Sequence, residues 1–127
     1  MNDSEKSQIL VVDDEPATCS FMKILLEMEG YKVETAGDVA SALERAAANP
    51  PDLTITDLRL PDGSGIDLAR ALQSTKNVPC FAISGLSVHD LSDGDRAVFA
   101  EYLTKPVDFA ILKTLVRQWT DKSRSQH

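Results

Sequence analysis

Five short apolar runs alternate with segments whose apolar residues recur at helical spacing, and this alternation constrains the fold most. The runs cover residues 8–12, 31–35, 51–57, 78–83 and 100–104. Each run has the length of a strand, and turn-forming or acidic residues stand at most of the junctions. Such alternation is typical of a parallel sheet that carries helices on both faces and is connected by right-handed crossovers.

We therefore predict an α/β fold with a doubly wound, five-stranded parallel sheet in the flavodoxin-like order 2-1-3-4-5. A chain of 127 residues is long enough to bury the core of one domain without disulfides. We place this domain at residues 8–120. A flexible N-terminus at 1–7 and a flexible tail at 121–127 should flank it.

The sequence makes specific predictions for the buried face of the first helix and for the length of the fourth. The first should bury one face whose residues recur at helical spacing, namely Ala17, Phe21, Ile24, Leu25 and Met28. The fourth should lie between Gly85 and Ala100, where Gly94 costs about 1 kcal/mol in a helix interior relative to alanine. We therefore expect the fourth helix to be short or irregular, and mobile or partly unwound.

Charge and hydropathy narrow the range of partners. A formal net charge of −7 argues against nonspecific binding to nucleic acid or to an anionic membrane. No apolar run approaches the length of a membrane span, and the N-terminus lacks the pattern of a signal peptide, so we expect a cytoplasmic protein. Cys19 and Cys80 lie in apolar patterns, which favours buried free thiols over a disulfide or a metal site.

Asp57 ends the third apolar run and begins the turn sequence that follows it. Pro61 fixes one backbone torsion in this turn, and Gly63 and Gly65 allow torsions that other residues avoid. In open α/β sheets, ligands bind in the crevice at the carboxyl ends of the strands. Alone, Asp57 is better explained as a cap of the turn or of the next helix. Its predicted neighbours change that interpretation.

Asp13 and Asp14 end the first run, which neighbours the third run in the predicted strand order. Their side chains should therefore lie beside Asp57. Three carboxylates packed together repel one another, and a divalent cation relieves that repulsion. Oxygen ligands select a hard ion, and Mg²⁺ fits because it keeps several waters and needs few protein carboxylates. Without Asp57, the acid pair would indicate only a solvated helix cap.

Ser84 and Lys105 follow the fourth and fifth strands at the same edge of the predicted sheet. Either residue alone would be an ordinary turn hydroxyl or a solvated lysine. Together with the acids they suit phosphoryl transfer to a carboxylate. Asp57 would be the nucleophile, and Mg²⁺, Ser84 and Lys105 would neutralise or bind the phosphoryl oxygens.

These residues belong to four motifs, which are 11–16 (VVDDEP), 57–65 (DLRLPDGSG), Ser84 and 102–106 (YLTKP). Jointly they resemble the receiver domain of two-component response regulators (CheY-like), and the resemblance runs from about residue 9 to residue 119. It implies that Asp57 accepts a phosphoryl group from a phosphohistidine. It further implies that Asp14 and Asp57 ligate Mg²⁺, that Asp13 acts largely through water, and that Arg59 contributes its main-chain carbonyl.

The resemblance also implies how the signal is read and how long it lasts. In receivers the residue matching Ser84 moves toward the phosphoryl group, and the residue matching Tyr102 rotates inward. The change then appears on the face of the fourth helix, fifth strand and fifth helix. Arg59 and Leu86 stand where bulk can obstruct the attacking water, which would slow dephosphorylation. The alternative that both are ordinary surface or loop residues stays open.

The implied partners are a sensor histidine kinase or a histidine phosphotransfer protein as donor, and a downstream effector protein or domain. A dimer formed on phosphorylation is a further option. Neither nucleic acid nor a membrane is expected as a direct partner. Such a chain would be a signalling phosphoacceptor that catalyses only its own phosphorylation and dephosphorylation, rather than an enzyme acting on other substrates.

Two other function classes fit parts of the same pattern. A phosphatase of the haloacid dehalogenase type also uses an aspartate nucleophile, but it requires a second acid two residues later, where this chain has Arg59. A pure interaction module would keep the fold and lose the acid pair or the lysine, whereas both are present here. The phosphoacceptor interpretation is therefore preferred.

Overall fold

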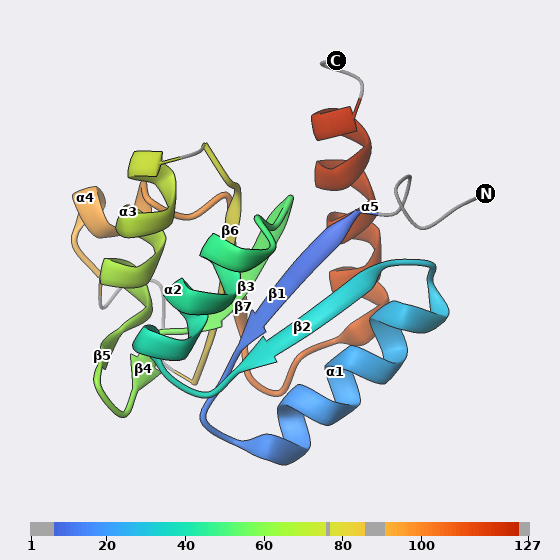
Figure 1. The fold of residues 1–127 in the computed structure, drawn as a ribbon, viewed down its shortest axis with the longest axis horizontal. Coiled ribbons are helices and arrows are strands. Elements are labelled where there is room, and N and C mark those ends of the chain that lie inside the picture. Colours follow the sequence, from blue (N-terminus) through green and yellow to red (C-terminus); the bar gives the residue numbers. More distant parts are fainter. Residues whose placement is uncertain (1–6, 76, 86–90, 125–127) are drawn as a thin grey trace.

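The computed structural model describes residues 7–75, 77–85 and 91–124 (Figure 1). Its main sheet consists of five parallel strands: β1 (Gln8–Val12), β2 (Lys32–Ala36), β3 (Leu53–Asp57), β6 (Cys80–Ser84) and β7 (Glu101–Thr104). The strand order is β2-β1-β3-β6-β7. This is the predicted order 2-1-3-4-5, because β4 and β5 form a separate hairpin, and the predicted fold class is confirmed.

Helices cover both faces of this sheet. On one face lie α1 (Pro16–Met28) and α5 (Phe109–Arg124) (Figure 1). The other face carries α2 (Val39–Ala48), α3 (Gly65–Thr75) and the single-turn helix α4 (Asp93–Arg96). The prediction of a short fourth helix is confirmed.

The strands are apolar on both sides because each side meets a layer of helices. On β1, Ile9 and Val11 pack in the core beneath α1 and α5, whereas Leu10 and Val12 pack in the core beneath α2 and α3. All four side chains are at most 2% exposed. Burial of one such side chain stabilises the fold by about 1.5–3 kcal/mol, so this central strand anchors both cores.

The predicted buried face of α1 is wrong. Phe21, Ile24 and Met28 are 61%, 58% and 76% exposed. The residues that α1 buries recur at the same spacing, two positions away: Cys19, Met22 and Leu26. A shift of two residues moves a stripe by about 160° around a helix, so the expected face points largely away from the sheet.

Described structure continues on both sides of residues 8–120. Ser7 is buried, and its carbonyl accepts a hydrogen bond of 3.0 Å from the amide of Lys32. At the other end α5 continues to Arg124, into the stretch expected as a tail. Among the described residues, none of the helices is both long and apolar enough to cross a bilayer.

Candidate functional site

Strand register brings the predicted site residues to one edge of the sheet. In β3, Asp57 lies opposite Ile83 of β6, so Ser84 is the next residue along that edge. Ser84 in turn lies opposite Thr104 of β7, and Lys105 follows directly. Asp13 continues from β1, and its amide donates to the carbonyl of Ala36 at 3.0 Å. The carboxyl ends of four neighbouring strands therefore converge on one place.

Asp13, Asp14 and Asp57 form a cluster of acids at this edge. One carboxylate oxygen from each lies within 4.8 Å of the others. Ligand oxygens of one octahedral Mg²⁺ are at most roughly 4 Å apart, since each lies about 2.1 Å from the ion. The cluster is thus close to the size that one cation requires, and a bound water could bridge the remaining distance. Three oxygen ligands fit a hard divalent cation.

Lys105 contacts two of these acids. Its Nζ donates hydrogen bonds to Asp57 Oδ2 at 2.8 Å and to Asp13 Oδ2 at 3.2 Å. Partial burial by itself lowers the pKa of Lys105, but the hydrogen bonds to Asp57 and Asp13 and the negative charges of both acids together outweigh it, so the pKa is raised. Lys105 is therefore held as an ammonium group, with donors directed at the acids.

The two carboxylates that Lys105 contacts are also oriented by main-chain donors. Asp13 Oδ1 accepts from the amide of Glu15 at 2.9 Å, and Asp57 Oδ1 accepts from the amide of Arg59 at 3.3 Å. The side chain of Asp13 is only 5% exposed and that of Asp57 is 12% exposed, whereas Asp14 is exposed. Asp57 therefore keeps limited access to solvent while its orientation is fixed.

Gly65 is required for the backbone geometry around Asp57. A Cβ atom at this position would overlap the carbonyl oxygen of Asp57, and the Gly65 amide donates to the carbonyl of Leu58 at 2.9 Å. A glycine permits this close approach of two main-chain segments. The turn that follows Asp57 therefore folds back against the end of β3.

The other residues predicted for the site are Ser84, Tyr102, Arg59 and Leu86. Ser84 is 2% exposed, and Tyr102 is partly buried on β7, opposite Ala82. Arg59 is exposed at the start of β4 (Arg59–Leu60). Leu86 lies outside the described residues.

Sequence reasoning missed the hairpin that follows Asp57 and one of its acids. β4 and β5 (Gly63–Ser64) pair antiparallel across the turn. Asp62 lies in this turn, and its carboxylate accepts hydrogen bonds from the amides of Val39 and Ala40 in α2. The letters PDG at 61–63 signal a turn, but nothing local to them indicates a contact with a helix that begins 23 residues earlier.

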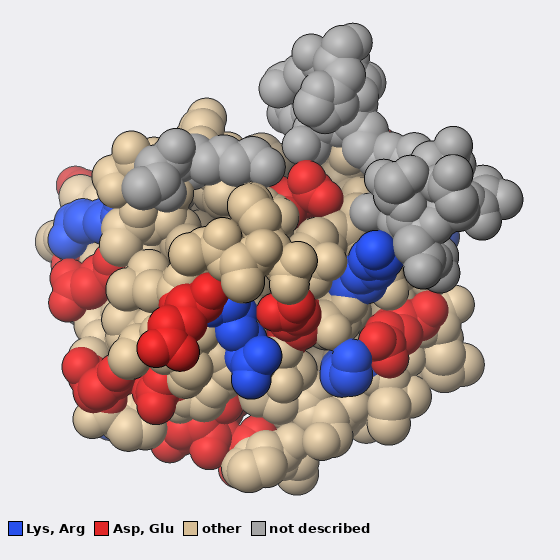
Figure 2. Space-filling model, in the orientation of Figure 1, with Lys and Arg blue, Asp and Glu red and all other residues tan. Residues whose placement is uncertain are grey.

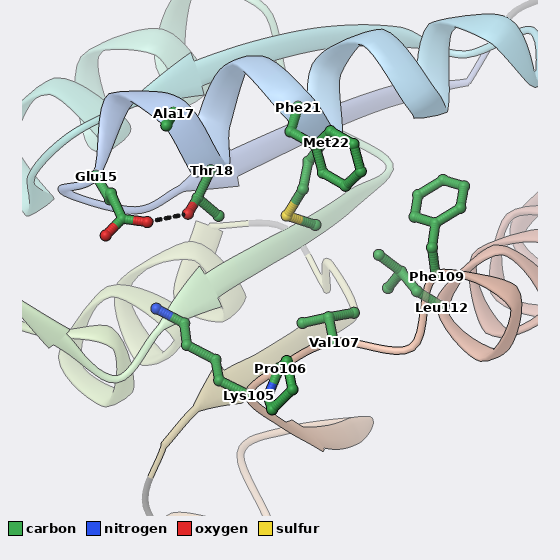
Figure 3. A pocket seen from close by; sticks show the side chains of 10 residues that line it. All are labelled: Glu15, Ala17, Thr18, Phe21, Met22, Lys105, Pro106, Val107, Phe109 and Leu112. Atoms are coloured by element: carbon green, nitrogen blue, oxygen red, sulfur yellow. Dashed lines mark hydrogen bonds between the residues drawn. The ribbon is translucent and has the colours of Figure 1, made fainter.

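An apolar pocket of about 440 Å³ opens beside the acid cluster, between α1 and the segment that leads into α5. Figure 3 shows Phe21 and Met22 extending into this pocket from α1, with Val107 and Phe109 on the side of α5. Lys105 lines the same pocket and connects it to the acids.

Comparisons with known proteins agree with this geometry. The response regulator receiver domain model matches residues 9–117. The transcriptional regulatory protein KdpE of Mycobacterium tuberculosis is 43% identical over 101 residues, which cover 77% of this chain and 44% of KdpE. The chain spans about half the length, or less, of the curated relatives that it matches.

Solved structures give the same result. A CheY-like receiver domain from Methylobacillus flagellatus superposes with a TM-score of 0.82 at 31% identity, covering 91% of this chain and 99% of that one. TrrA from Thermotoga maritima, solved in complex with Mg²⁺-BeF, superposes with a TM-score of 0.80 at 32% identity, covering 89% and 98%. Since the family model matches most of the chain and the fold and strand-end residues agree with it, the chain belongs to the response regulator receiver domain family.

Proposed function

We propose that Asp57 accepts a phosphoryl group from the phosphohistidine of a histidine kinase or a histidine phosphotransfer protein. A carboxylate oxygen of Asp57 would form the new bond to phosphorus. The bond from phosphorus to the imidazole nitrogen would break, and the nitrogen would leave with the electron pair. The observation that carries this proposal is the position of Lys105, whose ammonium group lies 2.8 Å from Asp57 Oδ2 beside two further acids.

The same residues would hold Mg²⁺. Asp14 and Asp57 would ligate it directly, Asp13 largely through water, and Arg59 through its main-chain carbonyl. When bound, the ion would neutralise charge on the phosphoryl oxygens during transfer. The spacing of the three carboxylates supports this set, and so does the relative TrrA, which was solved in complex with Mg²⁺-BeF.

Ser84 and Lys105 would bind the phosphoryl oxygens after transfer. Phosphorylation shifts a two-state equilibrium only if the phosphoryl group interacts better with one state, so these contacts must be stronger in the active form. Movement of Ser84 toward the group would let Tyr102 rotate inward and would change the surface around β7. The burial of Ser84 and the partial burial of Tyr102 support this role.

Arg59 and Leu86 would set the lifetime of the phosphorylated state. Both would flank the phosphoryl group, where their bulk would obstruct the water that hydrolyses it. Replacement of either residue by alanine should speed the loss of phosphate. The chain would thus catalyse its own phosphorylation and dephosphorylation.

Output would pass to an effector protein or to a further domain, or through a dimer formed on phosphorylation. KdpE is named a transcriptional regulatory protein and is more than twice the length of the matched segment. We therefore limit the expectation of no nucleic-acid binding to the 127 residues of this chain, whose formal net charge is −7.

Phosphorylation by a small-molecule donor tests the proposal. The wild-type chain, incubated with acetyl phosphate and Mg²⁺, should gain the mass of one phosphoryl group, and Asp57→Asn should gain none. Asp67→Asn, which removes an exposed acid from the first turn of α3, is the matched control and should still be labelled. An unlabelled wild-type protein would favour a pure interaction module, and sustained turnover of an aryl phosphate would favour a phosphatase.

A further inference from the structure

Asp62 joins the hairpin after Asp57 to the first residues of α2. Its Oδ1 accepts a hydrogen bond of 2.8 Å from the amide of Val39, and its Oδ2 accepts one of 3.1 Å from the amide of Ala40. The first amides of a helix have no partner within the helix, and its N-terminus attracts negative charge. The carboxylate of Asp62 therefore occupies a favourable position on another element of the chain.

The start of α2 already has a cap of its own. Asp38 is the N-cap residue, and its Oδ1 accepts from the amide of Ser41 at 2.7 Å and also from the hydroxyl of Ser41. A side chain of this kind at the N-cap is the usual way to satisfy a helix start. Asp62 is therefore not the only cap of α2. It also connects α2 to the β4–β5 hairpin.

The hairpin rests on α2 through apolar contacts as well. Leu60 is 9% exposed and packs in the core that also contacts Val39. A Cβ atom at Gly63 would lie 3.3 Å from Cγ2 of Val39, which shows how closely the two elements approach. Asp62 therefore secures the turn of a hairpin whose strands already lie against the helix.

The other end of this hairpin reaches the acid cluster. Arg59 pairs with Ser64 across the hairpin, and its amide donates to Asp57 Oδ1. The main chain at Arg59 is therefore held on one side by Asp57 and on the other by the hairpin. Any movement of the hairpin relative to α2 would displace the carbonyl that the proposed function assigns to the cation.

We propose that Asp62 is a positioning residue for the divalent cation: by fastening the β4–β5 hairpin to α2, it fixes the main-chain carbonyl of Arg59 for binding. This inference rests on the proposed function, which supplies the cation. Loss of Asp62 should weaken cation binding while leaving the chemistry at Asp57 intact once the site is saturated. The effect would travel through main-chain position and not through contact of Asp62 with the ion.

Charge offers a rival explanation, because any acid near the cluster attracts a cation. Figure 2 shows acidic side chains gathered in the lower left of the visible face, where Figure 1 places the hairpin and the start of α2. Two variants separate the explanations. Asp62→Asn removes the charge but keeps one carbonyl oxygen, which can accept from one of the two α2 amides. Asp38→Ala removes a charge and a cap of α2 at a residue outside the hairpin.

The first measurement uses the protein without divalent cation. Amide exchange by NMR reports the Gly65 amide, which donates to Leu58 and closes the hairpin, and the amides of Val39 and Ala40. In Asp62→Ala all three should exchange faster than in the wild type. In Asp38→Ala the Gly65 amide should keep its wild-type protection.

The second measurement is calorimetric titration with MgCl₂, followed by phosphorylation with acetyl phosphate across Mg²⁺ concentrations. Asp62→Ala should raise the Kd for Mg²⁺ by about threefold to tenfold, the size of a lost helix cap. At saturating Mg²⁺ its phosphorylation rate should stay within about twofold of the wild type. Asp62→Asn, which keeps one acceptor, should raise the Kd less than Asp62→Ala does, and Asp38→Ala should keep a Kd within about twofold of the wild type.

Three results would overturn the inference: a wild-type Kd in Asp62→Ala, an equal loss in Asp38→Ala, or a loss in Asp62→Asn as large as in Asp62→Ala. The last of these would assign the effect to charge. A wild-type protein that binds Mg²⁺ but is not labelled would reject the proposed phosphoacceptor function and leave the role of Asp62 intact. A labelled wild type with unchanged variant affinities would reject only the role of Asp62.

Discussion

Lys105 and Asp57 are 48 residues apart in the chain, yet Nζ of the lysine lies 2.8 Å from Oδ2 of the aspartate. The same ammonium group lies 3.2 Å from Asp13 Oδ2. Since Asp13 is almost completely buried, removal of the lysine would leave a charge with poor access to water. Lys105 therefore partly offsets the repulsion within the acid cluster, as a bound cation would.

Lys105→Ala should make the protein depend on Mg²⁺ for stability. Without the ion, the free energy of unfolding should fall by roughly 1–3 kcal/mol, because two charged hydrogen bonds are lost. Added Mg²⁺ should then raise the Tm more than it does in the wild type. Thermal unfolding with and without Mg²⁺ measures both effects. Lys23→Ala, which breaks the exposed pair with Glu27, is the control and should show the wild-type response.

Gly65→Ala should strongly destabilise the fold. The added Cβ would overlap the carbonyl of Asp57, so β3 or the following turn must move, at a cost of roughly 2 kcal/mol or more. Under the proposed function, phosphorylation at Asp57 should slow as well. Gly94→Ala is the matched control, because nothing lies within 4 Å of a Cβ there and alanine favours the helix by up to about 1 kcal/mol. Urea unfolding of both variants tests this contrast, and equal losses would contradict it.

The position of the candidate site follows from the sequence because the rule behind it is simple. Carboxyl ends of parallel strands meet at one edge, so residues that directly follow those strands must be neighbours. Asp13, Asp57, Ser84 and Lys105 all follow or end such strands. This rule predicts that the four side chains are neighbours, although it gives neither the distances between them nor their burial.

The parts that the sequence could not supply depend on contacts between distant segments. Helix α1 has two apolar stripes of equal spacing, and only packing against the sheet and α5 selects the one with Met22. The strands of the β4–β5 hairpin are two residues long, too short to show a periodic pattern. The contact of Asp62 with α2 joins segments whose separation carries no local signal.

Met22 and Met28 provide a direct test of which stripe α1 buries, since both are methionines on the same helix. Met22 is 5% exposed and Met28 is 76% exposed. Met22→Ala should lower the free energy of unfolding by about 2–5 kcal/mol because it opens a cavity. Met28→Ala should change it by less than about 0.5 kcal/mol. Urea denaturation of the two variants gives both values, and a larger loss for Met28→Ala would restore the face expected from the sequence.

Because Cys80 is buried, the free energy of unfolding should decrease as the pH rises above neutral. Desolvation raises the pKa of this thiol from its ordinary value of 9.0 to about 12. Above pH 9.0 the unfolded chain loses this proton, whereas the folded protein keeps it until the pH approaches 12. The unfolded state then binds fewer protons, so the free energy of unfolding falls as the pH rises, by up to about 1.4 kcal/mol per pH unit for this group.

Comparison of the wild type with Cys80→Ala isolates this effect. Both proteins are unfolded in urea, with a reductant present, from neutral pH to about one unit above the ordinary thiol value of 9.0. That range stays below the ordinary lysine value of 10.5, above which loss of the Lys105 ion pairs would add a second decline. The variant should be less stable at neutral pH because of its cavity, but its stability should decline less steeply above pH 9.0.

The buried Cys19, whose pKa is also raised, contributes the same decline to both proteins and cancels in the difference. Parallel curves for the two proteins would show that the folded state does not protect the Cys80 thiol.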